Sequence, residues 1–177
     1  MIAEEKTLEK THIFKGRIID VSVDTVLLPD GKKATRELVG HPGGVCIVAY
    51  DGENIYLVKQ YRKPYDEVVT ELPAGKLEYG ENPFECGKRE LLEEVGMTAE
   101  NFVSLGKFYS SPGFCSETIY AYLATDLKKV GQKLDEDEYL DVLKVKLDDA
   151  VKMVMDGEIC DGKSVSAILK AARILKK

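Results

Sequence analysis

Two glutamates four residues apart, Glu90 and Glu94, are the part of the sequence best suited to bind a metal ion. Residues i and i+4 of a helix lie on the same face, so these like charges repel each other on a helix surface. A hard divalent cation reverses the sign of that interaction, because Mg²⁺ prefers oxygen ligands and binds phosphates alongside one or two carboxylates. The alternative is a solvated helix face, since glutamate is a good helix former.

A longer pattern surrounds this pair and favours the metal interpretation. It is G-x5-E-x7-R-E-U-x-E-E-x-G-U, where U is bulky and apolar, with fixed positions at Gly75, Glu81, Arg89, Glu90, Glu93, Glu94 and Gly96. The pattern resembles the Nudix box with no departure at any defined position. Nudix hydrolases cleave a nucleoside diphosphate linked to another group. The resemblance therefore implies a pyrophosphohydrolase that uses Mg²⁺, with Mn²⁺ as an alternative, to neutralise diphosphate charge and activate water.

The same resemblance implies a role for each residue of the box. Glu90 and Glu94 would be the principal metal ligands, and the Ala74 carbonyl would supply a further oxygen. Glu93 would assist through metal-bound water. Arg89 would orient the glutamates rather than touch the substrate, and an i, i+4 ion pair between Arg89 and Glu93 is expected on the helix.

A run of four acidic residues at 135–138 is the second candidate for chemistry. The resemblance implies that glutamates of this loop serve as the catalytic base and as an additional metal ligand. We assign Glu136 as the base and Glu138 as the ligand, and an exchange of the two roles stays open. The alternative is a solvated acidic turn, which consecutive acids would suit well.

Segments outside the box indicate the substrate class. Ser111-Pro112-Gly113, with Pro112 sixteen residues beyond Gly96, resembles the ADP-ribose pyrophosphatase subfamily. Three further segments share that resemblance: Arg36-Glu37, Gln60-Tyr61-Arg62 and Glu71-Leu72-Pro73-Ala74-Gly75. Together they imply a small-molecule substrate, ADP-ribose, that is hydrolysed to AMP and ribose 5-phosphate.

The resemblance also implies which residues bind that substrate. Arg36 and Arg62 would face the diphosphate or the adenine, since a guanidinium offers both bidentate phosphate contacts and stacking. Pro112 and Gly113 would belong to the substrate site, and Glu117 is a lesser candidate near it. The alternative for the arginines is a surface salt bridge, and the alternative for the Pro-Gly pair is a simple turn.

Two other functions fit parts of the sequence. The first is hydrolysis of another nucleoside diphosphate sugar, such as GDP-mannose or UDP-glucose, because Pro112 and Arg62 do not identify the base. The second is a non-catalytic module that senses ADP-ribose or a related nucleotide. Such modules often carry a damaged box, whereas this box is undamaged, so an enzyme is favoured. Phe14 and Tyr61 both stay open as the aromatic residue that stacks on the base.

The elements that must position these residues follow from the apolar pattern. Buried strands are predicted at 45–50 and 55–61, a short strand at 68–73, and further strands near 102–110, 117–124 and 139–146. A helix is predicted to start after the cap Asn82, with Pro83 first and Glu85 completing a capping box, and to end at Gly96. Helices at 148–156 and 164–176, the second capped by Ser164, follow. We expect an α/β fold with a mixed sheet, which the resemblance makes a Nudix-type α/β/α sandwich.

Residues 1–42 are predicted to form a small antiparallel β unit ahead of the catalytic domain, residues 43–177. Residues 12–28 favour a strand, residues 29–32 a hairpin turn and residues 33–39 a second strand. A unit of about 40 residues buries little surface alone. In the subfamily such a unit exchanges between two subunits, so the resemblance implies a homodimer with Arg36 acting across the interface.

Composition limits the possible partners and compartments. The formal net charge of -6 argues against a broad basic surface for nucleic acid. The four cysteines form no C-x-x-C pair, so a zinc site is poorly supported. The N-terminus lacks an apolar signal-peptide core, and no apolar run is long enough to span a bilayer. We therefore expect no membrane association and a cytoplasmic protein with reduced thiols.

Overall fold

The computed structural model describes residues 4–134 and 139–176. By the contacts between its Cα atoms, the chain divides into two units. One unit comprises Met1–Gly43 with Tyr109–Thr118, and the other comprises Gly44–Phe108 with Ile119–Lys177. No helix within the described ranges is long and apolar enough to cross a membrane.

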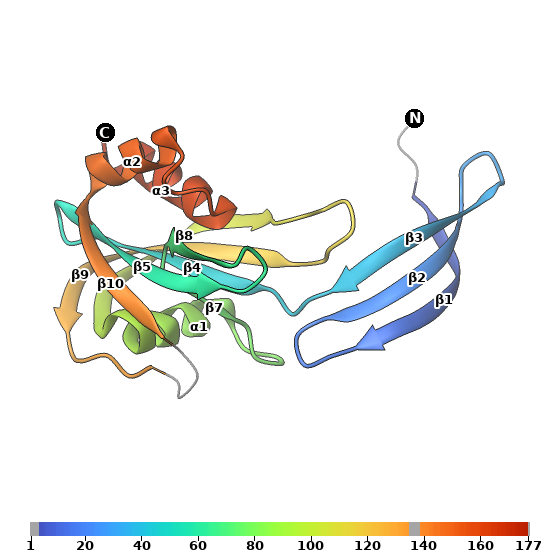
Figure 1. The fold of residues 1–177 in the computed structure, drawn as a ribbon, viewed down its shortest axis with the longest axis horizontal. Helices are drawn as coiled ribbons and strands as arrows, with labels where there is room; N and C mark the ends of the chain where they lie inside the picture. The colour runs from blue at the N-terminus through green and yellow to red at the C-terminus, as the bar shows by residue number, and fades with distance from the viewer. Residues whose placement is uncertain (1–3, 135–138, 177) are drawn as a thin grey trace. The chain divides into compact units, whose positions relative to one another are not determined.

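The first unit is built on a three-stranded antiparallel sheet in the order β1 (Lys6–Lys15), β2 (Asp20–Leu27) and β3 (Lys33–Gly40) (Figure 1). The predicted hairpin turn between β2 and β3 is confirmed, because Gly31 adopts φ 84° and its amide donates to the Leu28 carbonyl. A single strand over 12–28 is wrong. The chain turns at Gly16, whose amide donates to the Ile19 carbonyl, and the exposed segment before it forms β1.

The second unit contains two sheets. A mixed sheet has the order β7 (Ala74–Lys76), β4 (Gly44–Ala49), β9 (Thr118–Lys129) and β8 (Met97–Tyr109), with β4 parallel to β9. An antiparallel sheet has the order β10 (Leu140–Lys146), β5 (Asn54–Arg62) and β6 (Glu67–Glu71).

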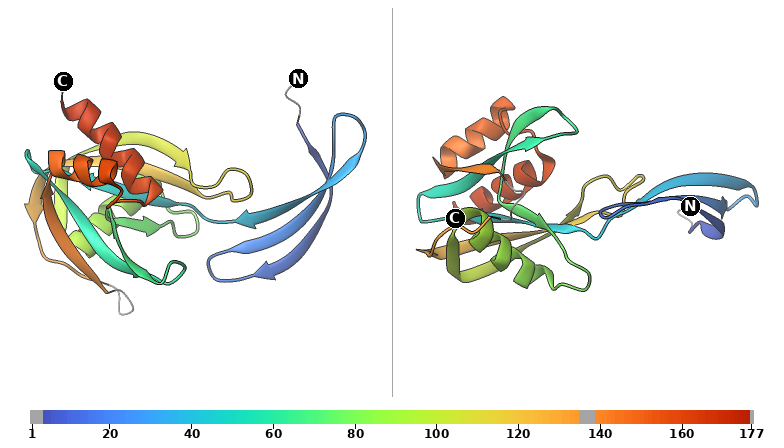
Figure 2. Two further views of the ribbon diagram at one scale, coloured as in Figure 1. Left: turned by 45° about the horizontal axis from the view of Figure 1, so that its top comes forward. Right: turned by 60° about the horizontal axis from the view of Figure 1, so that its bottom comes forward.

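Helices cover the mixed sheet on both sides. Helix α1 (Pro83–Glu90) continues into a short π-helix, η1 (Leu91–Val95), and lies on one side. Helices α2 (Leu147–Asp156) and α3 (Gly162–Leu175) lie on the other (Figures 1 and 2). The predicted α/β/α sandwich with a mixed sheet is confirmed.

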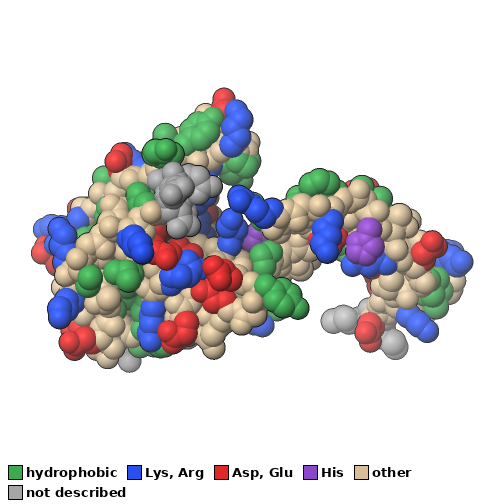
Figure 3. Space-filling model, turned by 90° about the horizontal axis from the view of Figure 1, so that it is seen from below, with side chains coloured by type: hydrophobic (Ala, Val, Ile, Leu, Met, Phe, Trp, Pro, Cys, Tyr) green, Lys and Arg blue, Asp and Glu red, His purple; other side chains and the backbone are tan. Residues whose placement is uncertain are grey.

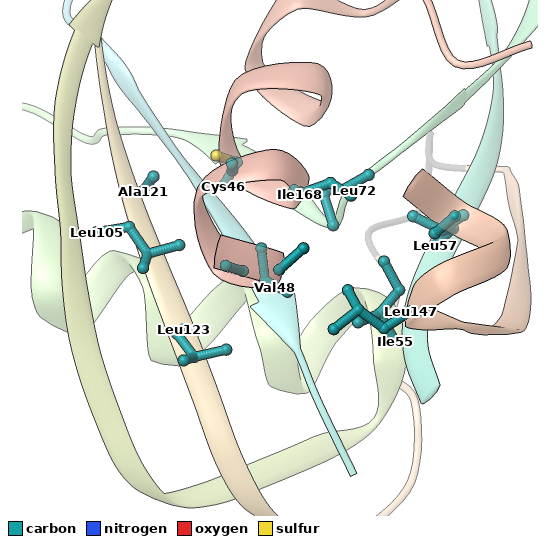
Figure 4. Packing of buried hydrophobic residues seen from close by; sticks show 14 of the residues in the cluster. Cys46, Val48, Ile55, Leu57, Leu72, Leu105, Ala121, Leu123, Leu147 and Ile168 are labelled. Carbon is teal, nitrogen blue, oxygen red and sulfur yellow. The ribbon is translucent and has the colours of Figure 1, made fainter. Parts of the chain in front are cut away.

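Strand β4 divides the hydrophobic core into two clusters. Every residue of β4 is buried, as expected for a strand whose two faces are both covered. Cys46 and Val48 pack toward α3, in the cluster shown in Figure 4. Ile47 joins the opposite cluster with Cys86 and Leu91 from α1 and η1. Alternation along one strand therefore anchors the helices of both layers, including the helix that carries the glutamates.

The helix boundaries follow local cap chemistry with two differences from expectation. The Asn82 side chain caps α1 by accepting from the Phe84 amide at 2.9 Å, as predicted. The Glu85 carboxylate lies 3.4 Å from Lys88 Nζ instead of completing a capping box. Ser164 was predicted to cap α3, which is wrong. Asp161 is the cap, and its carboxylate accepts from the Ser164 amide at 3.0 Å.

Candidate functional site

The glutamate pair lies in the interior of the second unit. Glu90 ends α1 with 6% of its surface exposed, and Glu94, in the π-helical turn that follows, has 2% exposed. A π-helical turn widens the helix locally, and such turns occur often at functional sites. Buried carboxylates need hydrogen bonds or counter-charges to offset the loss of hydration. The groups that contact this pair therefore define the site.

Strand β7 packs its backbone against both carboxylates. The Ala74 amide donates to Glu94 Oε2 at 2.8 Å. Gly75 faces Glu90 so closely that an added Cβ would lie 1.8 Å from Glu90 Oε1. Only glycine leaves space for the Glu90 side chain in this position. The glycine that opens the sequence pattern is thus explained by its contact with the first of the paired glutamates.

Arg89 connects the acidic residues of the box. Its Nε donates to Glu81 Oε1 at 3.0 Å, and its Nη1 donates to Glu90 and to Glu93, both at 2.8 Å. The predicted ion pair between Arg89 and Glu93 is confirmed. The hydrogen bond from Arg89 lowers the pKa of Glu81 to about 2, and the surrounding carboxylates raise the pKa of Arg89. Arg89 thereby reduces the repulsion among three carboxylates.

The carboxylates of Glu90 and Glu94 form a pair of oxygen donors that fits a divalent ion. Within the described ranges, no group of three or more His, Cys, Asp or Glu side chains is arranged to hold a metal ion. The Glu90 carboxylate contacts Arg89, and the Glu94 carboxylate contacts the Ala74 amide. Glu90 and Glu94 nevertheless offer two buried carboxylates beside Gly75. Mg²⁺ commonly takes one or two carboxylate ligands from a protein. On the face of the molecule seen from below, acidic and basic side chains lie side by side (Figure 3).

Arg62 belongs to the same unit as the glutamate pair. It ends β5, and its Nε donates to Glu71 Oε1 at 2.6 Å. Burial lowers the pKa of Arg62, but Glu71 and the nearby charge of Glu94 outweigh this and raise it overall. Glu71 is 2% exposed and also contacts Lys163 of α3. Glu71 lies in a family-like segment but had no predicted role, and Lys163 was not predicted, because their contact joins residues 92 positions apart in sequence.

The other predicted substrate residues lie in the first unit. Arg36 pairs with Glu5, its Nε donating at 2.9 Å, and the Glu117 carboxylate lies 3.5 Å from His41 Nδ1. Pro112 and Gly113 line a pocket of about 470 Å³ beside residues of β1, β2 and β3. The structure thus groups these residues in one unit and groups Arg62 with the glutamate pair in the other.

The predicted base and third ligand, Glu136 and Glu138, lie outside the described residues. The segment before them is joined to the end of η1. The Val130 and Gly131 amides donate to the Gly96 carbonyl at 2.9 and 3.0 Å. Gln132 Nε2 donates to the Glu94 carbonyl at 2.6 Å. The described residues up to 133 therefore run beside the helix that carries the glutamate pair.

Two known families match the chain. The NUDIX domain matches residues 40–165, and the nucleoside diphosphate sugar hydrolase N-terminal domain matches residues 5–39. The chain belongs to the Nudix family. Nudix hydrolases generally use a divalent metal, and the paired carboxylates of this enzyme provide oxygen ligands suited to one.

The chain is similar to several known proteins over nearly its whole length. The enzyme is 46% identical to the ADP-ribose pyrophosphatase of Bacillus subtilis (strain 168), covering 93% of this chain and 91% of that protein. It is 44% identical to the methanol dehydrogenase activator of Bacillus methanolicus, with the same two coverages. Its fold matches the crystal structure of an ADP compounds hydrolase with a TM-score of 0.89 at 23% identity, covering 99% of this chain and 96% of that one.

Proposed function

We propose that this Nudix hydrolase uses water to cleave the diphosphate of ADP-ribose, giving AMP and ribose 5-phosphate. The observation that carries the proposal is the buried pair Glu90 and Glu94, placed against the backbone of Ala74 and Gly75. The choice of ADP-ribose is supported by the similarity to the Bacillus subtilis ADP-ribose pyrophosphatase. It is also supported by the family-like segments around Arg62.

In this proposal the ion is Mg²⁺, held by Glu90 and Glu94, with the Ala74 carbonyl and Glu138 as further oxygen donors. Mn²⁺ is the alternative ion, because it accepts the same oxygen ligands. When bound, the ion would neutralise charge on the diphosphate and make phosphorus more electrophilic. Arg89 holds Glu90 in place by donating a hydrogen bond to it, and Glu93 accepts from the same Arg89 nitrogen and would assist through metal-bound water.

The remaining steps belong to side chains of the protein. Arg62 positions the diphosphate through its guanidinium, which is partly exposed beside the glutamate pair. Glu136, or Glu138 if the roles are exchanged, accepts the proton of the attacking water, and both lie outside the described residues. The bond that forms joins water oxygen to one phosphorus, and the bond that breaks joins that phosphorus to the bridging oxygen.

The proposal includes a homodimer in which the N-terminal unit, residues 1–42, completes the substrate site of the partner's catalytic domain, residues 43–177. Arg36 then acts across the interface, together with Pro112, Gly113 and Glu117 around the substrate. The exposed apolar side chains of β1 support this, because a lone sheet with exposed apolar residues gains stability from a covering partner. We place the enzyme in the cytoplasm, which suits four cysteines that form no disulfide.

The function is tested by comparing kcat/KM for ADP-ribose, GDP-mannose, UDP-glucose, NADH and ATP, using the full chain with Mg²⁺. ADP-ribose is expected to have the highest value, with AMP and ribose 5-phosphate as products. Chelation by EDTA should abolish turnover, and added Mg²⁺ or Mn²⁺ should restore it. A higher value for another substrate would overturn the assignment of ADP-ribose. A chelated enzyme that still turns over would overturn the metal assignment.

A further inference from the structure

The N-terminus of α3 contacts Glu71 and Leu72, which shortly precede strand β7 of the candidate site. Lys163 has 16% of its side chain exposed, and its Nζ lies 3.0 Å from Asp161 Oδ2 and in contact with Glu71 Oε2. The Ser164 hydroxyl accepts from the Leu72 amide at 2.7 Å. Burial lowers the pKa of Lys163, but Asp161 and Glu71 outweigh this and raise it overall. Lys163 is therefore a charged, partly buried partner of the buried Glu71.

Glu71 thus has its two carboxylate oxygens in contact with different cations. Oε2 contacts Lys163, and Oε1 accepts from Arg62 Nε at 2.6 Å. An arginine and a carboxylate often pair through two parallel hydrogen bonds, with both oxygens facing the guanidinium. Here the described contacts between Arg62 and Glu71 use Nε alone. The Arg62 side chain is 37% exposed, although the carboxylate that holds it is buried.

The charges in this group are balanced. Arg62 and Lys163 carry two positive charges, and Glu71 and Asp161 carry two negative charges. Breaking a buried ion pair by removing one partner leaves a charge that must find another counter-charge. Without Lys163, the counter-charge nearest to Glu71 is Arg62. If Lys163 did not contact Glu71 Oε2, this oxygen would be open to a second hydrogen bond from the Arg62 guanidinium.

We propose that Lys163 is a positioning residue for Arg62: by occupying Glu71 Oε2, it limits Arg62 to a single hydrogen bond through Nε and leaves the Nη edge for the substrate diphosphate. This inference rests on the proposed function, in which Arg62 contacts the diphosphate. It assigns a role in substrate binding to a lysine of the C-terminal helix that does not itself touch the substrate. Lys163 and Glu71 are 92 residues apart in sequence.

The first experiment is a double-mutant cycle on ADP-ribose hydrolysis with Lys163→Met and Arg62→Ala. K163M alone should raise KM about 10- to 100-fold, the range expected when hydrogen bonds to a charged group are lost, and change kcat little. In the R62A background, K163M should have little further effect on KM, because the residue it positions is already absent. Independent, additive effects of the two changes would overturn the proposal.

Two further variants separate positioning from folding. Lys163→Arg keeps a cation against Glu71 and should keep KM within about threefold of the wild type. Ser164→Ala is the matched structural control, because it removes the contacts of the hydroxyl with Leu72 and Asp161 on the same turn of α3 but leaves Glu71 paired. S164A should lower the melting temperature without raising KM. If S164A raises KM as much as K163M does, the role of Lys163 is only structural and the proposal fails.

A measurement on the free enzyme distinguishes failure of this inference from failure of the proposed function. The Nε–H signal of Arg62 is assigned by NMR from its loss in R62A, and its chemical shift reports the hydrogen bond to Glu71. K163M should shift this signal, and K163R should leave it near the wild-type position. An unchanged signal in K163M overturns the positioning role. A shifted signal together with no hydrolysis of ADP-ribose by the wild type overturns the substrate instead.

Discussion

Burying two carboxylates side by side costs free energy, and the contacts of Glu90 and Glu94 show how this cost is offset. The Ala74 amide donates to Glu94, and the Arg89 guanidinium donates to Glu90. Both donors stabilise the ionised form, which is the form that binds a divalent ion. At the scale of single residues, the site is thus preorganised to hold negative charge within the protein interior.

Replacing Glu94 with glutamine should separate catalysis from folding. The amide oxygen of glutamine can still accept from the Ala74 amide, so the circular dichroism spectrum and melting temperature should change little. Loss of one anionic ligand should reduce kcat on the order of 10²- to 10³-fold. Glu85→Gln is the matched control, since Glu85 lies on the same helix and pairs with Lys88 on the surface. Equal turnover in both variants would contradict the metal role of Glu94.

The hydrogen bonds between Glu81 and Arg89 should make stability depend on acid pH. The pKa of Glu81 is lowered from 4.5 to about 2 in the folded enzyme. A lowered pKa stabilises the folded state above the unfolded pKa, and this contribution is lost as the pH falls through the interval from 4.5 to about 2. Urea unfolding between pH 5 and pH 2 should therefore show a shallower loss of stability in Glu81→Gln than in the wild type. Parallel curves for the two proteins would refute this coupling.

Among the elements, β7 forms the site with the end of α1 and with η1, because its backbone closely approaches the Glu90 and Glu94 side chains. Replacing Gly75 with alanine should displace Glu90, because the added Cβ would overlap its carboxylate. We expect a loss of about 1–3 kcal/mol in the free energy of unfolding and weaker Mn²⁺ binding, measured by urea unfolding and calorimetry. Gly162→Ala is the control, since nothing lies within 4 Å of its added Cβ. A Gly75→Ala enzyme with wild-type stability and Mn²⁺ affinity would disprove this account.

Elements with local signals were predicted well, and elements set by distant contacts were not. The start and end of the glutamate helix follow from Asn82 and Gly96, whose cap chemistry is readable in the sequence. Strand β1 was not predicted over its full length, because most of its residues are polar and all are exposed, so that only pairing with β2 makes them a strand. Strand β7 has three residues and depends on its register with β4.

The same distinction applies to the candidate site. The glutamate pair was selected by spacing, because i, i+4 neighbours on a helix are neighbours in sequence. The role of Lys163 was not predicted, since its partner Glu71 lies 92 residues away and no local pattern links the two residues. Ser164 was taken for a cap because serine and aspartate both suit that position. The contact between Ser164 and Leu72 is also long-range.

For the whole molecule, the described residues of the N-terminal unit form strands β1, β2 and β3 and include no helix. All ten residues of β1 are exposed, including Ile13 and Phe14. The described part of the first unit has no hydrophobic core between a sheet and helices like that of the second unit. Its buried side chains include the polar Ser22 and Asp24. A single sheet of this kind needs another surface to cover it, and in the proposed dimer a second copy of the chain provides that surface.

The dimer is tested by a double change of Ile13 and Phe14 to lysine. Light scattering should give about twice the chain mass of 19.7 kDa for the wild type and about one chain mass for the variant. The dissociated variant should keep the circular dichroism spectrum of the wild type but lose nearly all ADP-ribose hydrolysis, because the partner's Arg36 no longer reaches the site. Met155→Lys, which changes an exposed apolar residue of α2, should remain dimeric and active. A folded monomer with full activity would show that each chain completes its own site.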